Sequence, residues 1–203
     1  ISHHATEDLA IMRAIPQLIV VAPGDKIEAG LATRAVYETA GACYLRLGRA
    51  NEPQVYKDSP KFEIGKAICV KTGGDIALIS TGGILDNVYK TSQALEKENI
   101  FTSIYSFHSL HPFDYQTFES IATSSKLIVT IEEHSVRGGL GGVVAETLSE
   151  MDFIRKPLLL RLGIQSEFTS VVGDQEYLRE HYGLSVNKMC DRIKKRLSSN
   201  FFH

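Results

Sequence analysis

The stretch from 132 to 142 combines acidic, basic and glycine residues at a spacing that could do chemistry. It reads Glu-Glu-His-Ser-Val-Arg-Gly-Gly-Leu-Gly-Gly. Glycines in such a turn let backbone N–H groups approach a ligand, as in phosphate-binding loops. The dinucleotide fingerprint, read from Gly139 and Gly141, would place its third glycine at position 144, which is Val144. We therefore expect a steric turn between a strand and a helix, without a nucleotide.

Histidines raise the alternative of a zinc site. His108, His111 and His134 follow predicted strands, and Glu132 or Glu133 is close to the last of them. Nitrogen and oxygen ligands of this kind suit zinc. Because the first two histidines lie on an irregular loop and no cysteine accompanies them, we do not predict a metal there. We expect Glu133 and His134 to hydrogen-bond across a domain boundary or to the turn that follows.

A strand and a helix must position these residues. The strand is indicated by a short β-branched apolar run, Leu127, Ile128, Val129 and Ile131, typical of a sheet buried on both faces. Apolar residues resume at helical spacing from Val143. Ligands and neighbouring domains bind at the carboxyl edge of such sheets. Arg137 could hold an anion at the helix start, but we expect a solvated side chain.

The rest of the chain also alternates strands and helices. Strands are predicted at 18–22, 43–47, 62–64, 67–70, 76–80, 101–106 and 158–162, and a loop at 107–113. Helices are predicted from Thr6, at 26–40, at 85–97, after Asp114, at 175–181 and after Ser185. Thr6, Asp114 and Ser185 are the expected N-caps. In the helix at 26–40, the repeat of Ile27, Leu31, Ala35 and Tyr37 marks the inward face.

This order predicts an α/β fold with two unequal parts. Residues 1–50 end in a βαβ unit with parallel strands, which buries too little apolar surface to be stable alone. Residues 51–66 are polar and form a linker. Residues 67–203 form a complete domain, a three-layer α/β/α arrangement around a mostly parallel sheet. We therefore expect a truncated unit followed by one intact domain.

Composition narrows the classes of function. The chain has 203 residues, 43% hydrophobic and 23% charged, with a net charge of −2. No basic surface is implied, so nucleic acid and anionic membranes are not expected partners. Three distant cysteines and the lack of an apolar run of about 18 residues predict a cytoplasmic protein with reduced thiols. The chain begins at Ile1 and has no methionine before Met12, so we expect a fragment or a processed product.

Three separated motifs resemble the transketolase family. Residues 2–9, Ser-His-His-Ala-Thr-Glu-Asp-Leu, are similar to the motif G-P-T-H-H-S-I-E-D, which continues into the strand end V-V-A-P-x-D, here residues 20–25. Residues 108–114 are similar to H-T-I-K-P-L-D, and 132–142 to E-E-H-x-x-x-G-G-L-G. The motifs occur in the family's order, and the resemblance covers about residues 1–195. It is closest to the small-subunit, or C-terminal half, type.

The resemblance implies an activity and a division of labour. Transketolases bind thiamine diphosphate and Mg²⁺ and move a two-carbon ketol unit between sugar phosphates, in the pentose phosphate pathway. Residues 1–50 then match the end of the pyrimidine-binding domain, and 67–203 match the C-terminal domain. The family's catalytic glutamate and its G-D-G metal motif have no counterpart here. The resemblance therefore implies no catalytic residue in this chain, no cofactor bound to it alone, and an inactive isolated fragment.

Substrate contacts are also implied by the resemblance. His3 matches a histidine that contacts the sugar phosphate, and Arg49 matches a phosphate-binding arginine, with Arg46 as the neighbouring alternative. His4 stands where other members carry glutamine, which favours a structural role. The implied partners are a missing N-terminal half or large subunit, in a homodimer or heterotetramer. Alternatives are another thiamine-dependent enzyme, such as a deoxyxylulose-phosphate synthase or a 2-oxoacid dehydrogenase β subunit, and a non-catalytic dimerisation or regulatory module.

Overall fold

The computed structural model describes residues 6–48, 52–153, 155–165 and 171–199. Its larger sheet has the strand order β3-β5-β4-β7-β8. The strands are β3 (Ile68–Lys71), β4 (Ile76–Thr81), β5 (Thr102–Ser106), β7 (Leu127–Ser135) and β8 (Leu158–Ile164). All neighbours pair in parallel except β3, which runs antiparallel to β5. The predicted mostly parallel sheet is confirmed.

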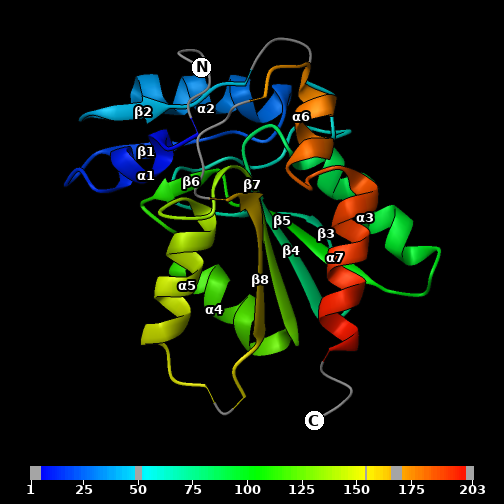
Figure 1. Cartoon of the computed structure of the whole chain (residues 1–203). Helices are drawn as coiled ribbons and strands as arrows, with labels where there is room; N and C mark the ends of the chain where they lie inside the picture. The colour runs from blue at the N-terminus through cyan, green and yellow to red at the C-terminus, as the bar shows by residue number, and fades with distance from the viewer. Residues whose placement is uncertain (1–5, 49–51, 154, 166–170, 200–203) are drawn as a thin grey trace.

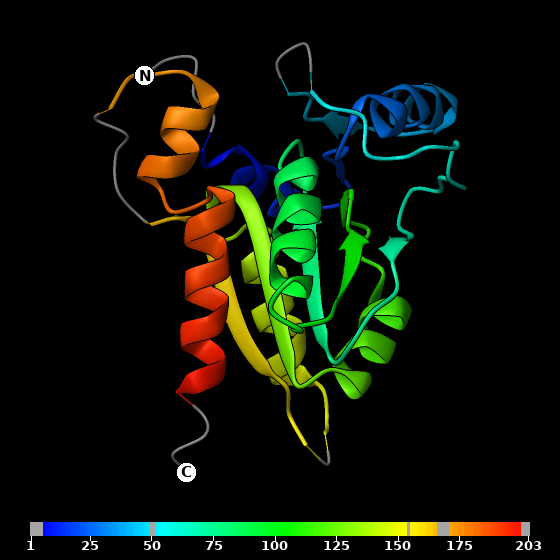
Figure 2. The same ribbon diagram turned by 90° about the vertical axis from the view of Figure 1, so that its right-hand side faces the viewer.

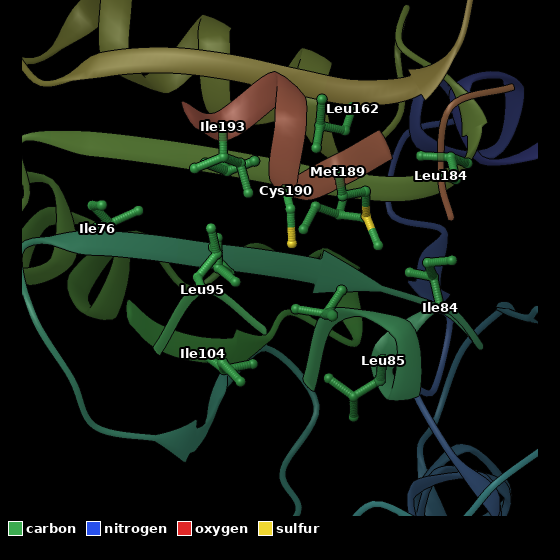
Figure 3. Close-up of a cluster of buried hydrophobic side chains, with 14 of the residues drawn as sticks. Ile76, Ile84, Leu85, Leu95, Ile104, Leu162, Leu184, Met189, Cys190 and Ile193 are labelled. Carbon is green, nitrogen blue, oxygen red and sulfur yellow. The ribbon is translucent and has the colours of Figure 1, made fainter. Parts of the chain in front are cut away.

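Helices cover both faces of this sheet (Figures 1 and 2). On one face lie α3 (Leu85–Glu96) and α7 (Val186–Ser198); on the other lie α4 (Tyr115–Ser124) and α5 (Leu140–Glu150). Figure 3 shows the hydrophobic core on the face covered by α3 and α7, where Met189, Cys190 and Ile193 of α7 pack with Leu95 of α3 and with strand residues. The predicted three-layer α/β/α fold is therefore confirmed.

The side chains of β7 pack into the hydrophobic cores on both faces of the sheet. Leu127 and Val129 pack into the core with α3 and α7, whereas Ile128 packs with α4 and α5. Successive side chains of a strand point to opposite faces, so a continuous apolar run is what a doubly covered strand requires. Burial continues past the apolar run, since Glu132 and His134 are also fully buried.

A smaller sheet of order β2-β1-β6 adjoins the larger one. The helix α1 (Asp8–Arg13) precedes this sheet in the chain. Two of its strands, β1 (Ile19–Val21) and β2 (Cys43–Leu45), are connected by the helix α2 (Lys26–Glu38) and are parallel, as predicted. Its third strand is β6 (Ser109–His111), antiparallel to β1. The prediction of a loop at 107–113 was therefore wrong, because this short strand forms by pairing with a segment about 90 residues earlier in the chain.

Several local predictions also differ from the structure. The predicted strand at 62–64 is absent from the described residues, and Phe62 instead stacks on His108 at 4.0 Å. At α1 the N-cap is Glu7, and the Thr6 hydroxyl donates to the Glu7 carboxylate. Tyr37 was predicted to face inward but is 89% exposed, because α2 turns Glu28 and Ala32 toward the core.

Other helix ends agree more closely. The Asp114 side chain accepts from Thr117 N at 3.2 Å, which confirms the predicted cap of α4. Ser185 occupies the N-cap of α7, but its hydroxyl donates to the Glu180 carboxylate and bonds no backbone N–H of the helix. The helix α6 (Gln175–His181) has the predicted bounds. None of the helices in the described ranges is long and apolar enough to cross a membrane.

Candidate functional site

The first described segment of the chain, residues 6–48, lies against the carboxyl edge of the larger sheet. Glycine turns follow β4, at 81–83, and β7, at 138–142, on this edge. Figure 1 shows α1, α2, β1 and β2 gathered at the same end of the molecule. In open α/β folds this edge forms the crevice in which ligands bind. Here side chains of the protein itself fill this position. We call the region where they meet the junction; it is formed by Asp8, Arg46, Glu133, His134 and Arg179.

Glu132 holds the start of α5. Its carboxylate accepts from Leu140 N and from Gly141 N, both at 2.7 Å. Burial raises the pKa of Glu132 to about 7, against the effect of these two bonds and of Arg46 and Arg13. The N–H groups that an external phosphate would need at a helix N-terminus are therefore bonded to an internal carboxylate.

The glycine turn is required by this contact. A Cβ atom at Gly139 would lie 2.0 Å from Glu132 Oε2 and 2.6 Å from His134 Nδ1. Gly138 has a φ of +76°, and a Cβ there would lie 2.5 Å from Cβ of Ala10 on α1. Close approach, together with one left-handed residue, therefore explains these two glycines.

His134 joins β7 to α1. Its Nδ1 lies 2.8 Å from Ser135 O, so Nδ1 carries the proton and Nε2 accepts from Ala10 N at 3.4 Å. Nε2 also lies 3.9 Å from Asp8 Oδ1, a buried atom without a hydrogen-bond partner in the described part of the chain. Burial lowers the pKa of His134. The neutral ring therefore serves as a contact between the first segment and the larger sheet.

Arg46, at the end of β2, binds the same region. Its Nε lies 3.0 Å from Asp8 Oδ2 and its Nη2 donates to Glu133 O at 3.1 Å. Tyr44 also donates to Asp8 Oδ2, at 2.7 Å. Burial, followed by the bond and charge of Asp8, raises the pKa of Tyr44 to about 12. The expected hydrogen bond of His134 to the first segment is thus present, whereas Glu133 reaches that segment only through its backbone carbonyl, and its carboxylate bonds Arg179 and Gln175 of α6.

Arg179 reaches the junction from the opposite side. Its side chain is only 6% exposed and donates to Glu133 Oε1 at 2.8 Å and to Gly83 O at 3.1 Å. A further carboxylate, Glu52, lies near Arg46 and Arg179. Burial and the charge of Glu133 raise the pKa of Glu52 to about 7. The junction therefore alternates cations and carboxylates.

Val55 and Tyr56, in the segment predicted as a linker, are bonded to Asp25 beside the junction. Asp25 Oδ1 accepts from Ile27 N and Glu28 N at the start of α2, while Oδ2 accepts from Val55 N at 2.9 Å and Tyr56 N at 3.3 Å. The Tyr56 hydroxyl donates to the buried Glu28 carboxylate, and burial raises the pKa of Glu28. One aspartate thus caps a helix and holds the linker.

Only some of the residues singled out from the sequence lie within the described part of the chain. His3, His4 and Arg49 lie outside the described residues, whereas Arg46 lies in the junction. Arg137 is exposed, as expected for a solvated side chain.

The three histidines each have separate partners. His111 Nδ1 bonds to Leu18 O, and His108 Nδ1 lies 3.0 Å from the Ser109 hydroxyl. Burial lowers the pKa of His108 to about 4. Within the described ranges, no three His, Cys, Asp or Glu side chains converge on a metal position. The first N–H groups of α5 are also bonded internally, to the Glu132 carboxylate, so this helix start does not offer them to a diphosphate.

Sequence reasoning missed Arg179 and the second role of Asp25. Asp25 stands in Pro-Gly-Asp before a helix, which indicates a cap but not a bond to the linker. Arg179 lies in a polar helix, and no sequence signal marks it as buried. Both roles depend on segments that are distant in the sequence.

Comparison with known proteins identifies the family. The family described as "Transketolase, C-terminal domain" matches residues 65–189. The chain belongs to the transketolase family. It is 34% identical over 198 residues to a putative transketolase C-terminal section from Methanocaldococcus jannaschii, and the match covers 97% of this chain and 61% of that protein. It is 32% identical to one of the subunits of an apulose-4-phosphate transketolase from Phocaeicola vulgatus, over 93% of this chain and 59% of that one.

A solved structure agrees with this transketolase assignment. It is described as a split gene transketolase, an inactive beta4 tetramer, and is 32% identical with a TM-score of 0.85. The likeness covers 97% of this chain and 62% of that chain. The chain therefore spans about three fifths of the length of these relatives. The resemblance noted from the motifs is confirmed, and the match to the transketolase C-terminal domain includes all five strands of the larger sheet and ends within α7.

Proposed function

We propose that this chain is the C-terminal portion of a thiamine-diphosphate-dependent transketolase, which transfers a two-carbon ketol unit between sugar phosphates. The observation that carries the proposal is the similarity over 97% of the chain to a transketolase C-terminal section, together with the TM-score of 0.85 to a split gene transketolase. The relative that is itself one subunit of a transketolase supports the existence of a partner chain. The pentose phosphate pathway and a homodimer or heterotetramer belong to the same proposal.

The proposed division places the end of a pyrimidine-binding domain in residues 1–50, a linker in 51–66 and the C-terminal domain in 67–203. The bonds of Asp25 to Val55 and Tyr56 support a linker that is held in place. The chain's role in the enzyme is then assembly and contact with the substrate phosphate.

The cofactor is proposed to be held by the N-terminal half or large subunit. When bound, thiamine diphosphate with Mg²⁺ supplies the carbanion chemistry of ketol transfer. The internal bonding of the α5 N-terminus to Glu132 supports this assignment.

His3, Arg49 and Arg46 are proposed as contacts to the sugar phosphate. A guanidinium can form paired charge-assisted bonds to phosphate oxygens. Arg46 already bonds Asp8 and the Glu133 carbonyl, so it also ties the end of β2 to the larger sheet.

Reconstitution tests the proposal. The chain is combined with its complementary half at saturating thiamine diphosphate and Mg²⁺, and ketol transfer to an aldose phosphate is measured. We expect activity in the combination and none in either half alone. Turnover by this chain alone, or no transfer by any reconstituted assembly, would contradict the proposal. Product formation from pyruvate as the donor, without ketol transfer, would indicate a deoxyxylulose-phosphate synthase or a 2-oxoacid dehydrogenase.

A further inference from the structure

Arg179 is a buried cation that the proposed function leaves without a role. Its helix, α6, lies at the surface, yet its guanidinium points inward and is 6% exposed. Arginine is rarely buried unless its donors are satisfied. Here Nε donates to Glu133 Oε1 at 2.8 Å, Nη1 to Glu176 Oε1 at 2.7 Å and Nη2 to Gly83 O at 3.1 Å. These bonds join the ends of β4 and β7.

Glu133 passes this constraint to the first segment. Gln175 Nε2 lies 3.2 Å from Glu133 Oε1, so α6 holds the carboxylate through two residues. The backbone carbonyl of the same glutamate accepts from Arg46 Nη2 at 3.1 Å. Arg46 is held on its other side by Asp8 Oδ2 at 3.0 Å. A displacement of Glu133 would therefore move one of the acceptors that orient Arg46.

The side chains that form this chain of contacts are partly buried. The Glu133 side chain is 24% exposed and the Arg46 side chain 20% exposed, so both are largely withdrawn from water. Hydrogen bonds between charged groups are stronger in such surroundings than at the surface. Glu52 lies beside both arginines, with a pKa raised to about 7 by burial and the charge of Glu133. The end of β2 is thus connected to α6 through the hydrogen bond of Arg46 to the Glu133 backbone carbonyl and the ion pair of the Glu133 carboxylate with Arg179.

We propose that Arg179, acting through Glu133, is a positioning residue for Arg46, which directly follows β2. The inference rests on the proposed function, which assigns the substrate phosphate to Arg46 and Arg49. Paired bonds between a guanidinium and a phosphate require a fixed orientation. Arg179 therefore contributes to recognition of the phosphate, and its loss leaves the transfer step itself intact.

The test uses the assembled enzyme with Arg179→Met, which removes the donors but keeps an apolar side chain. We expect KM for a phosphorylated acceptor to rise about tenfold, the size of effect that follows when a misplaced Arg46 loses one hydrogen bond to the substrate phosphate. We expect kcat, and KM for the same sugar without phosphate, to stay within about twofold. Arg179→Lys keeps the charge and should restore part of the affinity. The matched control is Lys194→Met, which removes a long cation of α7 paired with Glu98 at 2.9 Å, away from the junction.

Hydrogen exchange supplies a readout besides activity. In the assembled enzyme, the peptide covering 43–48 should exchange faster in Arg179→Met than in the wild type or in Lys194→Met. An unchanged KM for the phosphorylated acceptor in a folded Arg179→Met enzyme overturns the inference, whatever the exchange shows. If that variant does not fold, as judged by circular dichroism, Arg179→Lys must show a smaller rise in KM in the same direction, and no rise overturns the inference. A wild-type enzyme that does not distinguish the two acceptors contradicts the proposed function instead.

Discussion

The Glu132 carboxylate lies 2.7 Å from the backbone nitrogen of Gly141, a residue of the next helix. The first N–H groups of a helix have no intrahelical acceptors, and a capping side chain usually precedes the helix directly. In this protein the acceptor comes instead from β7, before the glycine turn. The strand end, the turn and the helix start are therefore held together by one fully buried side chain.

Replacing Glu132 tests this arrangement. Glu132→Ala should lower the free energy of unfolding by about 2–4 kcal/mol, because two buried N–H groups lose their acceptor. Glu132→Gln keeps one acceptor oxygen and should cost less. Urea denaturation measures both variants. Glu119→Gln, at an exposed position of α4, should change stability by less than about 0.5 kcal/mol. A Glu132→Ala variant as stable as this control would contradict the assignment.

Two glycines provide a matched pair. Gly139→Ala should cost more than about 2 kcal/mol, since its Cβ would lie 2.0 Å from Glu132 Oε2 and the core must shift. At Gly30, within α2, a Cβ would meet no atom within 4 Å. Gly30→Ala should therefore raise stability by about 0.5–1 kcal/mol through the better helix propensity of alanine. Chemical denaturation decides, and equal effects of the two changes would refute the close approach at Gly139.

The double role of Asp25 predicts an unusual sensitivity to amide substitution. Both carboxylate oxygens accept backbone N–H groups, so in Asp25→Asn the amide NH₂ must face either the helix start or the linker. We expect a loss of about 1–3 kcal/mol and faster proteolysis near Val55. Asp174→Asn, at an exposed cap of α6 that bonds Tyr177 N, should cost only a few tenths of a kcal/mol. Similar losses in both variants would show that the linker bonds contribute nothing.

The buried ring of His108 predicts a dependence of stability on pH. Burial lowers its pKa from 6.5 to about 4, so below pH 6.5 the unfolded state binds more protons than the folded state. The lowered pKa of His108 therefore costs no stability above pH 6.5, and the free energy of unfolding decreases as the pH falls from 6.5 toward 4. Between pH 7 and 4.5 the wild type should lose about 2–3 kcal/mol more than His108→Phe, which keeps a ring against Phe62.

Denaturation midpoints of the wild type and His108→Phe at both pH values measure this difference. The raised pKa of Glu132 acts in the opposite direction, with stability lost as the pH rises from 4.5 to about 7. It acts in both proteins and cancels in the comparison. Parallel pH profiles would show that His108 does not titrate differently in the folded state.

Sequence reasoning succeeded where the deciding interactions are local. The apolar run at the start of β7 indicated a strand buried on both faces, and Asp114 indicated a helix start. It failed where a distant segment decides. The strand at 109–111 exists because β1 supplies its partner, and Tyr37 is exposed because α2 turns a buried glutamate toward the linker tyrosine. Propensity and period describe a segment by itself and carry no information on its partner.

The candidate site divides in the same way. By itself the sequence determined the order of the helices and of the longer strands, the glycine turn after β7 and the motifs that indicate a transketolase. Only the tertiary structure decided that Glu132 bonds the start of α5, that Arg179 is buried against Glu133 and that Asp25 holds the linker. The physical reason is that a charged side chain is stable in the interior only where specific partners satisfy it. In this chain those partners come together only when the sheets and helices have packed.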